Sequence, residues 1–119
     1  MKLDAGRIVL VDWRDALPRE ASKRGRPAVV VEDGELFDES YPNLILVPLA
    51  EDPHLAIEDL SVRIEPTAEN GCTKTCHALA HHVTATSKSR VLRDTGSSVT
   101  LAQLARIRCL IALSIGIEV

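Results

Sequence analysis

The pattern of apolar and polar residues divides the chain into a series of short strands followed by one helix. Residues 6–13, 27–33 and 44–49 are apolar runs, rich in β-branched residues, with the length of strands. Residues 60–66 alternate apolar with polar positions, which is typical of a strand with one exposed face. Residues 76–85 predict a fifth strand, in which alanine and histidine replace the usual β-branched residues.

The segments between the predicted strands have the composition of loops. Residues 14–25 have no apolar period and contain proline and glycine, and residues 34–43 combine glycine, proline and asparagine with acids. Residues 51–59 are a polar connection with room for one helical turn, and residues 69–74 favour a turn. We therefore expect consecutive strands joined by exposed loops.

The last segment, residues 99–116, predicts the one long helix. Thr100 is a favourable N-cap, Gln103 occupies the capping-box position three residues later, and Gly116 is a natural stop. The apolar positions at helical spacing are Leu101, Leu104, Ile107 and Ile111. Strands followed by one helix indicate a mainly β, α+β fold, a small barrel or sandwich in a single domain over residues 1–119.

The helix is apolar on every side from Cys109 to Leu113. One side can face the core, and the opposite side needs a second cover. A second copy of the protein is the simplest cover, so we expect a homodimer in which this helix takes part.

Composition excludes several classes of protein. The 119 residues are 45% hydrophobic and 26% charged, which is ordinary for a globular domain. Trp13, Phe37 and Tyr41 are the only aromatic residues, so the core is expected to be aliphatic and platforms for base stacking are nearly absent. No apolar run reaches the ~18–20 residues of a membrane span, and no charged-then-apolar leader opens the chain, so we expect a cytoplasmic protein.

Charge is unevenly distributed along the chain. The formal net charge is −3, but residues 14–26 hold five basic residues against two acidic ones, and residues 88–108 hold five against one. Residues 32–69 are the acidic part, with eleven carboxylates and a single arginine. If the two basic segments meet in space they form a patch suited to an anionic partner, and otherwise they are solvated faces.

A group of cysteines and histidines has spacing that a metal site could use. The pattern Cys-x3-Cys-His-x3-His over Cys72, Cys76, His77, His81 and His82 offers ligands that zinc accepts. In a strand, however, His77 and His81 point to one face and His82 to the other, and no second compact pair of ligands occurs. Three cysteines in a cytosolic chain are usually reduced and structural. We therefore expect packing rather than a metal or a redox pair.

The sequence RGRPAVVVEDG at 24–34 places two arginines at the start of an apolar strand. Pro27 fixes its own φ and favours an extended conformation at Arg26, and Gly25 lets another group approach the backbone closely. Arg26 is therefore expected on a stiff element, where a charge can be aimed. A salt-bridged surface arginine fits the same pattern, so these residues alone do not decide which charge Arg26 faces.

The order of these motifs resembles the MazF/PemK toxins of bacterial toxin–antitoxin pairs. GRIVLVDW, a polar loop, GRPAVVV and LILVPLA follow one another as the family's Gly-Asp-φ-φ-φ-Val-Asp, Gly-Ser-Glu-Gln, Gly-x-Arg-Pro-φ-φ-φ and φ-φ-Val-x-φ-Thr segments do. LAHHVTATSKSRV (79–91) and ALSIGIEV (112–119) are similar to its Leu-x-Gln-φ-Arg-x-φ-x-Lys-x-Arg-φ segment and its closing helix. Each motif alone is weakly specific, but the series covers nearly the whole chain in the family's order.

The resemblance implies the small SH3-like antiparallel β-barrel of that family, a homodimer, and an antitoxin as partner. It also implies sequence-specific cleavage of single-stranded RNA without a metal or another cofactor. Arg26 falls on the family's active-site arginine, and Glu20 is the surviving match to the glutamate of its loop. The residues expected to bind RNA are Lys23, Arg24, His82, Thr84 and Lys88.

Arginine suits this reaction. When a ribose 2′-hydroxyl attacks the adjacent phosphodiester, negative charge builds up on the equatorial phosphate oxygens, and a planar guanidinium can hold two of them. Arg26 is permanently charged, so we expect electrostatic stabilisation from it rather than proton donation. The products would be a 2′,3′-cyclic phosphate and a 5′-hydroxyl.

The chain departs from the family at several site positions. Ala50 stands where the family has its active-site threonine, so that hydroxyl is missing. PREASK (18–23) replaces Gly-Ser-Glu-Gln, His82 replaces a glutamine, and Thr84 replaces an arginine. The general base is left open among Glu20, Ser22, Glu51, His54 and His82, and of these residue types histidine has the most suitable ordinary pKa, near ~6.5.

These departures leave a second function open. A degenerate toxin would bind its antitoxin, or another protein, without cutting RNA. The CcdB-like topoisomerase poisons share the fold but act through a tryptophan next to the C-terminus, and this C-terminal segment has none. A topoisomerase target is therefore not expected, and an RNA-cleaving toxin is the preferred interpretation.

Overall fold

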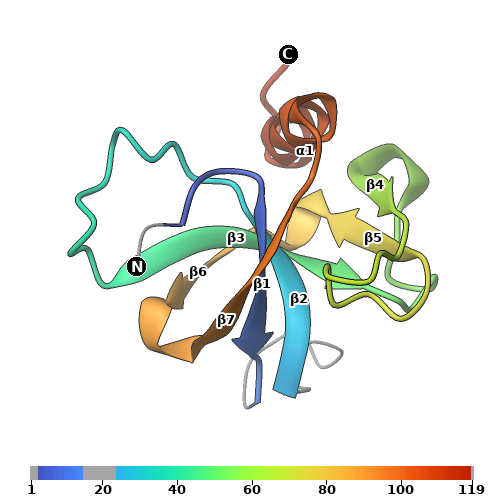
Figure 1. Cartoon of the computed structure of the whole chain (residues 1–119). Coiled ribbons are helices and arrows are strands. Elements are labelled where there is room, and N and C mark those ends of the chain that lie inside the picture. The colour runs from blue at the N-terminus through green and yellow to red at the C-terminus, as the bar shows by residue number, and fades with distance from the viewer. Residues whose placement is uncertain (1–2, 15–23, 119) are drawn as a thin grey trace.

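The computed structural model describes residues 3–14 and 24–118, which form a curled antiparallel sheet with one helix lying across it (Figure 1). Within these residues the strands are β1 Arg7–Asp12, β2 Arg24–Val30, β3 Asn43–Ala50, β4 Ser61–Ile64, β5 Cys76–Leu79, β6 Thr84–Ser87 and β7 Val91–Ser98. The helical elements are the short 3-10 turns η2 Glu58–Leu60, η3 Ala80–His82 and η4 Lys88–Arg90, and the helix α1 Leu101–Ser114. The predicted α+β class, mainly β with a C-terminal helix, is confirmed.

β3 is the central strand of the sheet. The hydrogen-bonded order is β4-β5-β3-β2-β1-β7, and β6 also pairs with β3. One edge of β3 pairs with β2. The other edge has two partners, because Leu46 lies opposite Thr84 of β6 and Ala50 lies opposite His77 of β5. β4 and β7 are the two ends of the path, so the sheet of the described residues is an open form of the barrel that the resemblance implies.

The segment 76–85 is interrupted, contrary to the prediction of one strand. β5 ends at Leu79, the chain passes through η3, and β6 begins at Thr84. Both strands pair with the same edge of β3, one after the other along it. η3 connects them, and its Ala80 is fully buried. The prediction was wrong here because composition does not show where a strand leaves a sheet edge.

β7 is a strand that the sequence analysis did not predict. It pairs with β1, from Ser98 opposite Arg7 to Val91 opposite Val11, and the register shifts twice along the way. Its sequence VLRDTGSS is mostly polar. A strand at the end of a sheet has only one neighbour and can remain polar, so backbone pairing with β1, rather than an apolar pattern, defines β7.

Because side chains alternate between the two faces of a strand, the sheet has an apolar core on each face. The core between the sheet and α1 contains, among others, Ile8, Val29, Val47, Leu49, Ile64 and Ile107. The core on the other face, inside the curl, consists of Leu3, Val9, Val11, Trp13, Ala28, Val30, Leu44 and Leu46. Trp13 is only 3% exposed, so this tryptophan is a packing residue.

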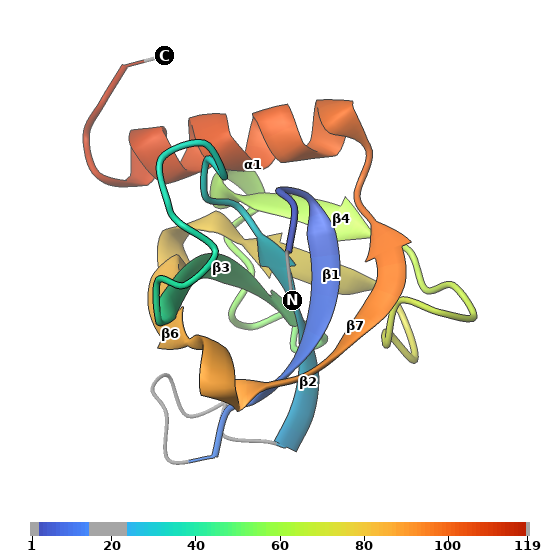
Figure 2. The same cartoon turned by 60° about the vertical axis from the view of Figure 1, so that its left-hand side comes forward.

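α1 lies across one side of the sheet, next to β4 (Figure 2). Its predicted capping box is confirmed, because the Gln103 N–H donates to Thr100 Oγ1 at 3.0 Å and the Thr100 N–H donates to Gln103 Oε1 at 2.9 Å. Arg108 donates to the carbonyl oxygens of Val31 and Glu32, at 3.0 and 3.1 Å, which fixes the helix to the end of β2. No helix in the described part of the chain is long and apolar enough to cross a membrane.

The buried face of α1 differs from the predicted one. Its fully packed side chains are Leu104, Ile107 and Leu110. Burying each such side chain contributes roughly 1.5–3 kcal/mol, so this face holds the helix to the sheet. The large apolar side chains left exposed on and after the helix are Leu101, Leu113, Ile115 and Ile117. Leu101 is therefore not a core residue, and Leu110 belongs to the core rather than to a surface for a second copy.

Candidate active site

Arg26 lies near the start of β2, beside the carboxyl end of β3. Gly25 before it has a φ of +77°, which L side chains rarely adopt, and Pro27 after it keeps the strand extended. The Arg26 guanidinium donates through Nη1 to Oε1 of Glu51 and through Nη2 to the carbonyl oxygen of Leu49, both at 3.2 Å. The Arg26 side chain is 20% exposed, so it is held on stiff backbone and still reaches solvent.

Glu51, the residue directly after β3, links Arg26 to a second segment of the chain. Its Oε1 also accepts a hydrogen bond from Oγ1 of Thr73 at 2.7 Å. Partial burial would raise the pKa of Glu51, but the hydrogen bonds from Thr73 and Arg26, with the charge of Arg26, outweigh burial and lower this pKa. The carboxylate is therefore ionised at neutral pH.

The turn between β4 and β5 brings Thr73 to Glu51. Asn70, 2% exposed, organises this turn through its side chain. Its amide oxygen accepts from the N–H groups of Thr67 and Cys72, at 3.2 and 3.0 Å, and its amide nitrogen donates to the carbonyl oxygen of Glu65 at 2.9 Å. A buried side chain that meets three backbone groups gives the turn one defined shape.

Gly71 lets the same turn approach the sheet closely. Its φ is +79°, and a Cβ at this position would lie 2.7 Å from Cδ2 of Leu10 and 3.6 Å from Cβ of Pro27. Any other residue here would be strained by the positive φ, and its Cβ would require the end of the Leu10 side chain to shift. The backbone conformation of this turn, two residues before Thr73, is therefore one that glycine adopts without strain.

Two cysteines complete the surroundings of Arg26. Cys72 lies in the turn and Cys76 begins β5, and both belong to the buried core on the α1 side. A hydrogen bond from the Cys72 thiol lowers the pKa of Cys76 against the effect of burial, and the nearby Arg26 guanidinium acts in the same direction. The same hydrogen bond, together with burial, raises the pKa of Cys72. The Cys76 thiol itself donates to the carbonyl oxygen of Lys74, with Sγ and the oxygen 3.6 Å apart.

Ala50, the last residue of β3, is 4% exposed and offers this group of side chains only a methyl group. Thr73, which lies in a different segment, supplies a hydroxyl that is hydrogen-bonded to Glu51, the residue after Ala50. The sequence analysis named Glu51 as one of several bases but did not identify Thr73. Nothing in the local sequence NGCTK indicates which strand end this turn will meet.

Four of the residues that the sequence analysis named precede Arg26 in the chain. Glu20, Ser22 and Lys23 lie outside the described residues. Arg24 begins β2, and its backbone lies opposite Asp12 of β1. The roles of these residues stay predictions.

His82 lies in η3, which packs against α1, and its ring centroid is 4.4 Å from that of His81. Burial, followed by the charge of His81, lowers the pKa of His82. In the described part of the chain, Nδ1 of each ring is buried without a hydrogen-bond partner. These surroundings favour a neutral, packed His82, which makes it a poor partner for a phosphate.

The five cysteines and histidines with metal-like spacing are divided among different elements. Cys72 and Cys76 lie in the turn and at the start of β5, whereas His81 and His82 lie in η3 rather than in a strand. The argument from strand alternation was therefore wrong for these two histidines. Among the residues that the structure describes, no group of three His, Cys, Asp or Glu side chains is arranged to hold a metal ion.

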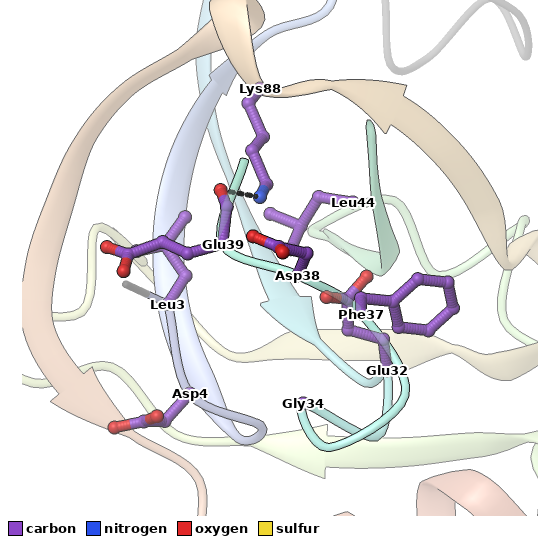
Figure 3. A pocket seen from close by; sticks show the side chains of 9 residues that line it. All are labelled: Leu3, Asp4, Glu32, Gly34, Phe37, Asp38, Glu39, Leu44 and Lys88. Atoms are coloured by element: carbon purple, nitrogen blue, oxygen red, sulfur yellow. Dashed lines mark hydrogen bonds between the residues drawn. The ribbon is translucent and has the colours of Figure 1, made fainter. Parts of the chain in front are cut away.

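Thr84 and Lys88 lie beside the first half of β3, whereas Arg26 contacts its end. Thr84 lies opposite Leu46. The Lys88 ammonium donates to the carbonyl oxygen of Glu39 at 2.9 Å, in a pocket that is also lined by acidic side chains (Figure 3). These side chains are Asp4, Glu32, Asp38 and Glu39. Their charge disfavours a phosphate at this position, and a role of Lys88 in RNA binding stays a prediction.

Arg90 brings the two basic segments together in the described part of the chain. Arg90, in η4, donates to the carbonyl oxygens of Asp12 and Arg14, at 3.0 and 2.9 Å. The Asp12 carboxylate also holds the Arg14 guanidinium, with Oδ2 and Nη2 2.8 Å apart. Arg108, in contrast, contacts the end of β2 from α1. In the described part of the chain, Arg90 therefore joins the second basic segment to the start of the first.

Comparison with known proteins identifies one family. The sequence profile described as PemK-like, MazF-like toxin of type II toxin–antitoxin system matches residues 4–115. A comparison with curated protein sequences found no match.

Solved structures share this fold at low sequence identity. MazF (Form-I) from Deinococcus radiodurans has a TM-score of 0.74 and 17% identity, covering 98% of this chain and 99% of that chain. An endoribonuclease from a mycobacterial species, in complex with its cognate antitoxin, has a TM-score of 0.71 and 16% identity, covering 99% of both chains. The Mycobacterium tuberculosis toxin MazF-mt6 has a TM-score of 0.71 and 13% identity, covering 95% and 99%. At these identities the structures establish the fold alone.

Proposed function

This chain is a member of the PemK-like, MazF-like toxins of type II toxin–antitoxin systems, and we propose that it is a metal-independent endoribonuclease that cleaves single-stranded RNA at a specific sequence. The observation that carries the proposal is the Arg26 guanidinium, fixed by Glu51 and Leu49 at the end of β3. A planar cation on a stiff strand can bind two oxygens of one phosphate group. The mycobacterial endoribonuclease with the same fold supports this activity.

The reaction that suits this site is the attack of a ribose 2′-hydroxyl on the adjacent phosphorus atom. A bond from O2′ to phosphorus forms, and the bond to O5′ of the next nucleotide breaks. Arg26 stabilises the charge on the two non-bridging oxygens, and one such donor contributes about 10²–10³ in rate. The products are a 2′,3′-cyclic phosphate and a 5′-hydroxyl.

Glu51 is the group best placed to accept the proton of the 2′-hydroxyl. Among the base candidates that the structure describes, which are Glu51, His54 and His82, only Glu51 is hydrogen-bonded to Arg26. In the free protein Arg26 helps to lower the pKa of Glu51. When the guanidinium turns to a phosphate, this influence is withdrawn and the carboxylate becomes a stronger base. Its proton then passes through solvent to the departing O5′.

Thr73 has a positioning role in this scheme. Its hydroxyl keeps the Glu51 carboxylate in place when Arg26 leaves it for the phosphate. The turn that carries Thr73 is fixed by buried Asn70, so this second contact does not depend on substrate. Thr73 thereby supplies the site with a hydroxyl that Ala50 lacks.

We place substrate recognition on the basic segment around β2. Lys23 and Arg24 precede Arg26 and can hold neighbouring phosphates. Thr84, the first residue of β6, lies opposite Leu46 of β3 and is a candidate for contact with a base or ribose. An RNA that contacts all of these residues must be extended, so single-stranded RNA is the proposed substrate. The site of action is then the cytoplasm.

We also propose a homodimer and an antitoxin partner. The exposed apolar residues Leu113, Ile115 and Ile117 at the end of α1 support a second copy there. The D. radiodurans MazE-MazF complex, with a TM-score of 0.70 and 18% identity, supports an antitoxin. We place an acidic antitoxin segment on the basic residues 14–26. Reversing Lys23, Arg24 and Arg26 to Glu together should weaken that complex, and unchanged affinity would place the interface elsewhere.

The nuclease proposal is tested with purified protein, a synthetic single-stranded RNA pool and EDTA. We expect cleavage in EDTA, with products whose 5′ ends polynucleotide kinase phosphorylates directly and whose 3′ ends carry a cyclic phosphate. A requirement for a divalent ion, or products with a 5′-phosphate, would contradict the proposed reaction.

The alternative function is binding without catalysis. The specific observation that favours it is Ala50, which leaves the end of β3 without a hydroxyl. Wild-type protein that binds an acidic antitoxin peptide but cuts no RNA in the pool would select this alternative.

A further inference from the structure

We propose that a hollow beside His77 binds one guanine base of the RNA, next to the phosphate that Arg26 holds. The identity of this ligand rests on the proposed function, in which the substrate is single-stranded RNA. The hollow has a volume of about 390 Å³, which is in the usual range for a pocket that binds a small molecule. It is lined by Pro53, Ala56, Glu58, Ser61, Arg63 and His77.

The pairing of the strands places this hollow next to Arg26. His77 of β5 lies directly opposite Ala50 of β3. Arg26, on β2, donates to the Leu49 carbonyl oxygen and to the Glu51 carboxylate, which belong to the residues before and after Ala50. Neighbouring strands are about 4.8 Å apart, so His77 lies about one strand spacing from the backbone that Arg26 contacts (Figure 1). A nucleotide with its phosphate on Arg26 can therefore place its base at His77.

Alternation along β5 directs His77 to the hollow. Cys76 and Ala78, before and after it, are fully buried in the core on the α1 side, whereas His77 is half-buried. Side chains alternate between the faces of a strand, so the imidazole projects from the opposite face. Arg63 of β4 lies opposite His77 and borders the hollow. Its guanidinium is bound to Glu65, with Nε and Oε1 2.6 Å apart, so we do not assign it to the base.

The connection from β3 to β4 completes the wall of the hollow. The Ser61 hydroxyl donates to the carbonyl oxygen of Ile57 at 2.7 Å, across the single turn η2 that carries Glu58. Pro53 and Ala56, earlier in the same connection, add an apolar part on which the face of a base can lie. This wall is therefore formed before a ligand binds.

The polar groups that border the hollow accept more hydrogen bonds than they donate. Ser61 has given its hydrogen to Ile57, so its oxygen is left as an acceptor. In the described part of the chain, Glu58 has no hydrogen bond or ion pair, and its carboxylate offers two acceptor oxygens. A neutral His77 offers one N–H donor and one acceptor. A base that fits must therefore present two adjacent donors and one acceptor.

Guanine has this pattern on its Watson–Crick edge. Its N1–H and N2–H groups are adjacent donors that one carboxylate can accept together, and its O6 accepts from an N–H group. We assign the two donors to Glu58 and O6 to His77. Adenine, cytosine and uracil each present an acceptor beside their donor, and a carboxylate repels that acceptor. The hollow therefore selects guanine.

Nucleotide binding to the whole protein tests the pocket without cleavage. The 3′- and 5′-monophosphates of guanosine, adenosine, cytidine and uridine are titrated and followed by NMR. We expect a guanosine monophosphate to bind about tenfold more tightly than the others. Equal affinity for the four bases, or no binding at millimolar concentration, would overturn the proposal.

Variants identify the groups that read the base. Glu58→Gln should remove the preference for guanine, because its amide group opposes one of the two donors. His77→Ala should weaken binding of the guanosine monophosphate about tenfold, and His77→Gln, which keeps an N–H donor, should retain most of it. Asp59→Asn is the matched control, because Asp59 follows Glu58 in η2 but does not line the hollow. Guanine preference that survives Glu58→Gln in folded protein, as judged by circular dichroism, would overturn the assignment.

The positions at which the wild type cuts a single-stranded RNA pool test the link to Arg26. We expect a guanine beside each phosphate that is cut, and Glu58→Gln should cut with this preference lost. Cuts by the wild type at phosphates without a neighbouring guanine would overturn the proposal. If the wild type cuts no RNA, the proposed function fails, and the nucleotide titration still decides whether the hollow binds guanine.

Discussion

Arg26 and Thr73 donate hydrogen bonds to the same atom, Oε1 of Glu51, at 3.2 and 2.7 Å. The first comes from the start of β2, and the second from the turn before β5. The Glu51 carboxylate is therefore hydrogen-bonded to both segments. A change in the turn that moves Thr73 therefore alters how Glu51 holds Arg26.

Arg26→Ala should abolish RNA cleavage and leave the fold intact, because the side chain reaches solvent rather than lying in the core. The rate should fall by about 10²–10³. Arg26→Lys should recover little, since an ammonium cannot hold two phosphate oxygens as a planar fork does. Cleavage rates and circular dichroism check both variants.

Arg63 provides a matched control for that experiment. It is a mostly exposed arginine whose Nε lies 2.6 Å from Oε1 of Glu65, so it is also ion-paired but at a different place in the fold. Arg63→Ala should keep wild-type activity. Cleavage that survives Arg26→Ala would remove Arg26 from the mechanism.

Thr73→Val should lower the cleavage rate by about tenfold, because Glu51 loses the hydroxyl that orients it, and Thr73→Ser should restore most of the rate. The control is Thr75→Val. Thr75 donates to Oε2 of Glu65 at 2.9 Å, so this variant removes an equivalent bond outside the site. Equal losses in the two valine variants would indicate a general effect on the turn instead.

Ala50→Thr should raise the cleavage rate if a hydroxyl at the end of β3 is what the site lacks. Ala50 is 4% exposed, so the larger side chain must be accommodated by its neighbours. Ala50→Val has the same shape without the hydroxyl and separates chemistry from packing. The expectation fails if both variants change the rate alike.

Glu51→Gln should change how stability depends on pH. A pKa lowered in the folded protein means that the unfolded chain binds the proton more readily, so Glu51 stabilises the fold above its ordinary pKa of ~4.3 and this contribution is lost as pH falls through the lowered value. Urea unfolding from neutral pH into the acid range should therefore show a smaller loss of stability for Glu51→Gln than for wild type. Parallel curves would contradict the assignment.

Leu113→Asp should dissociate the proposed dimer and leave a folded monomer, because Leu113 is 48% exposed. Leu110→Ala should instead cost about 2–5 kcal/mol of stability, since Leu110 is only 1% exposed. Light scattering and thermal unfolding separate the two effects. A single-chain mass for the wild type at micromolar concentration would exclude the dimer.

The sequence determined what depends on neighbours along the chain. The β-branched runs of β1 and β3 and the capping box of Thr100 and Gln103 are local features, and each is found where the pattern placed it. β2 is also present, but it spans Arg24–Val30 rather than the predicted 27–33. Arg26 lies on a strand as predicted, between Gly25 and Pro27, and its backbone is opposite Val11 of β1. Local conformational preference was sufficient for these elements.

Only the tertiary structure decided which groups meet. β7 has no apolar pattern and exists because β1 offers it an edge, and the 76–85 segment breaks because β3 presents two separate pairing sites. The same cause lies behind the site. Glu51 and Thr73 come together through buried Asn70 and the close approach of Gly71 to Leu10, contacts that span distant parts of the sequence and that no local pattern encodes.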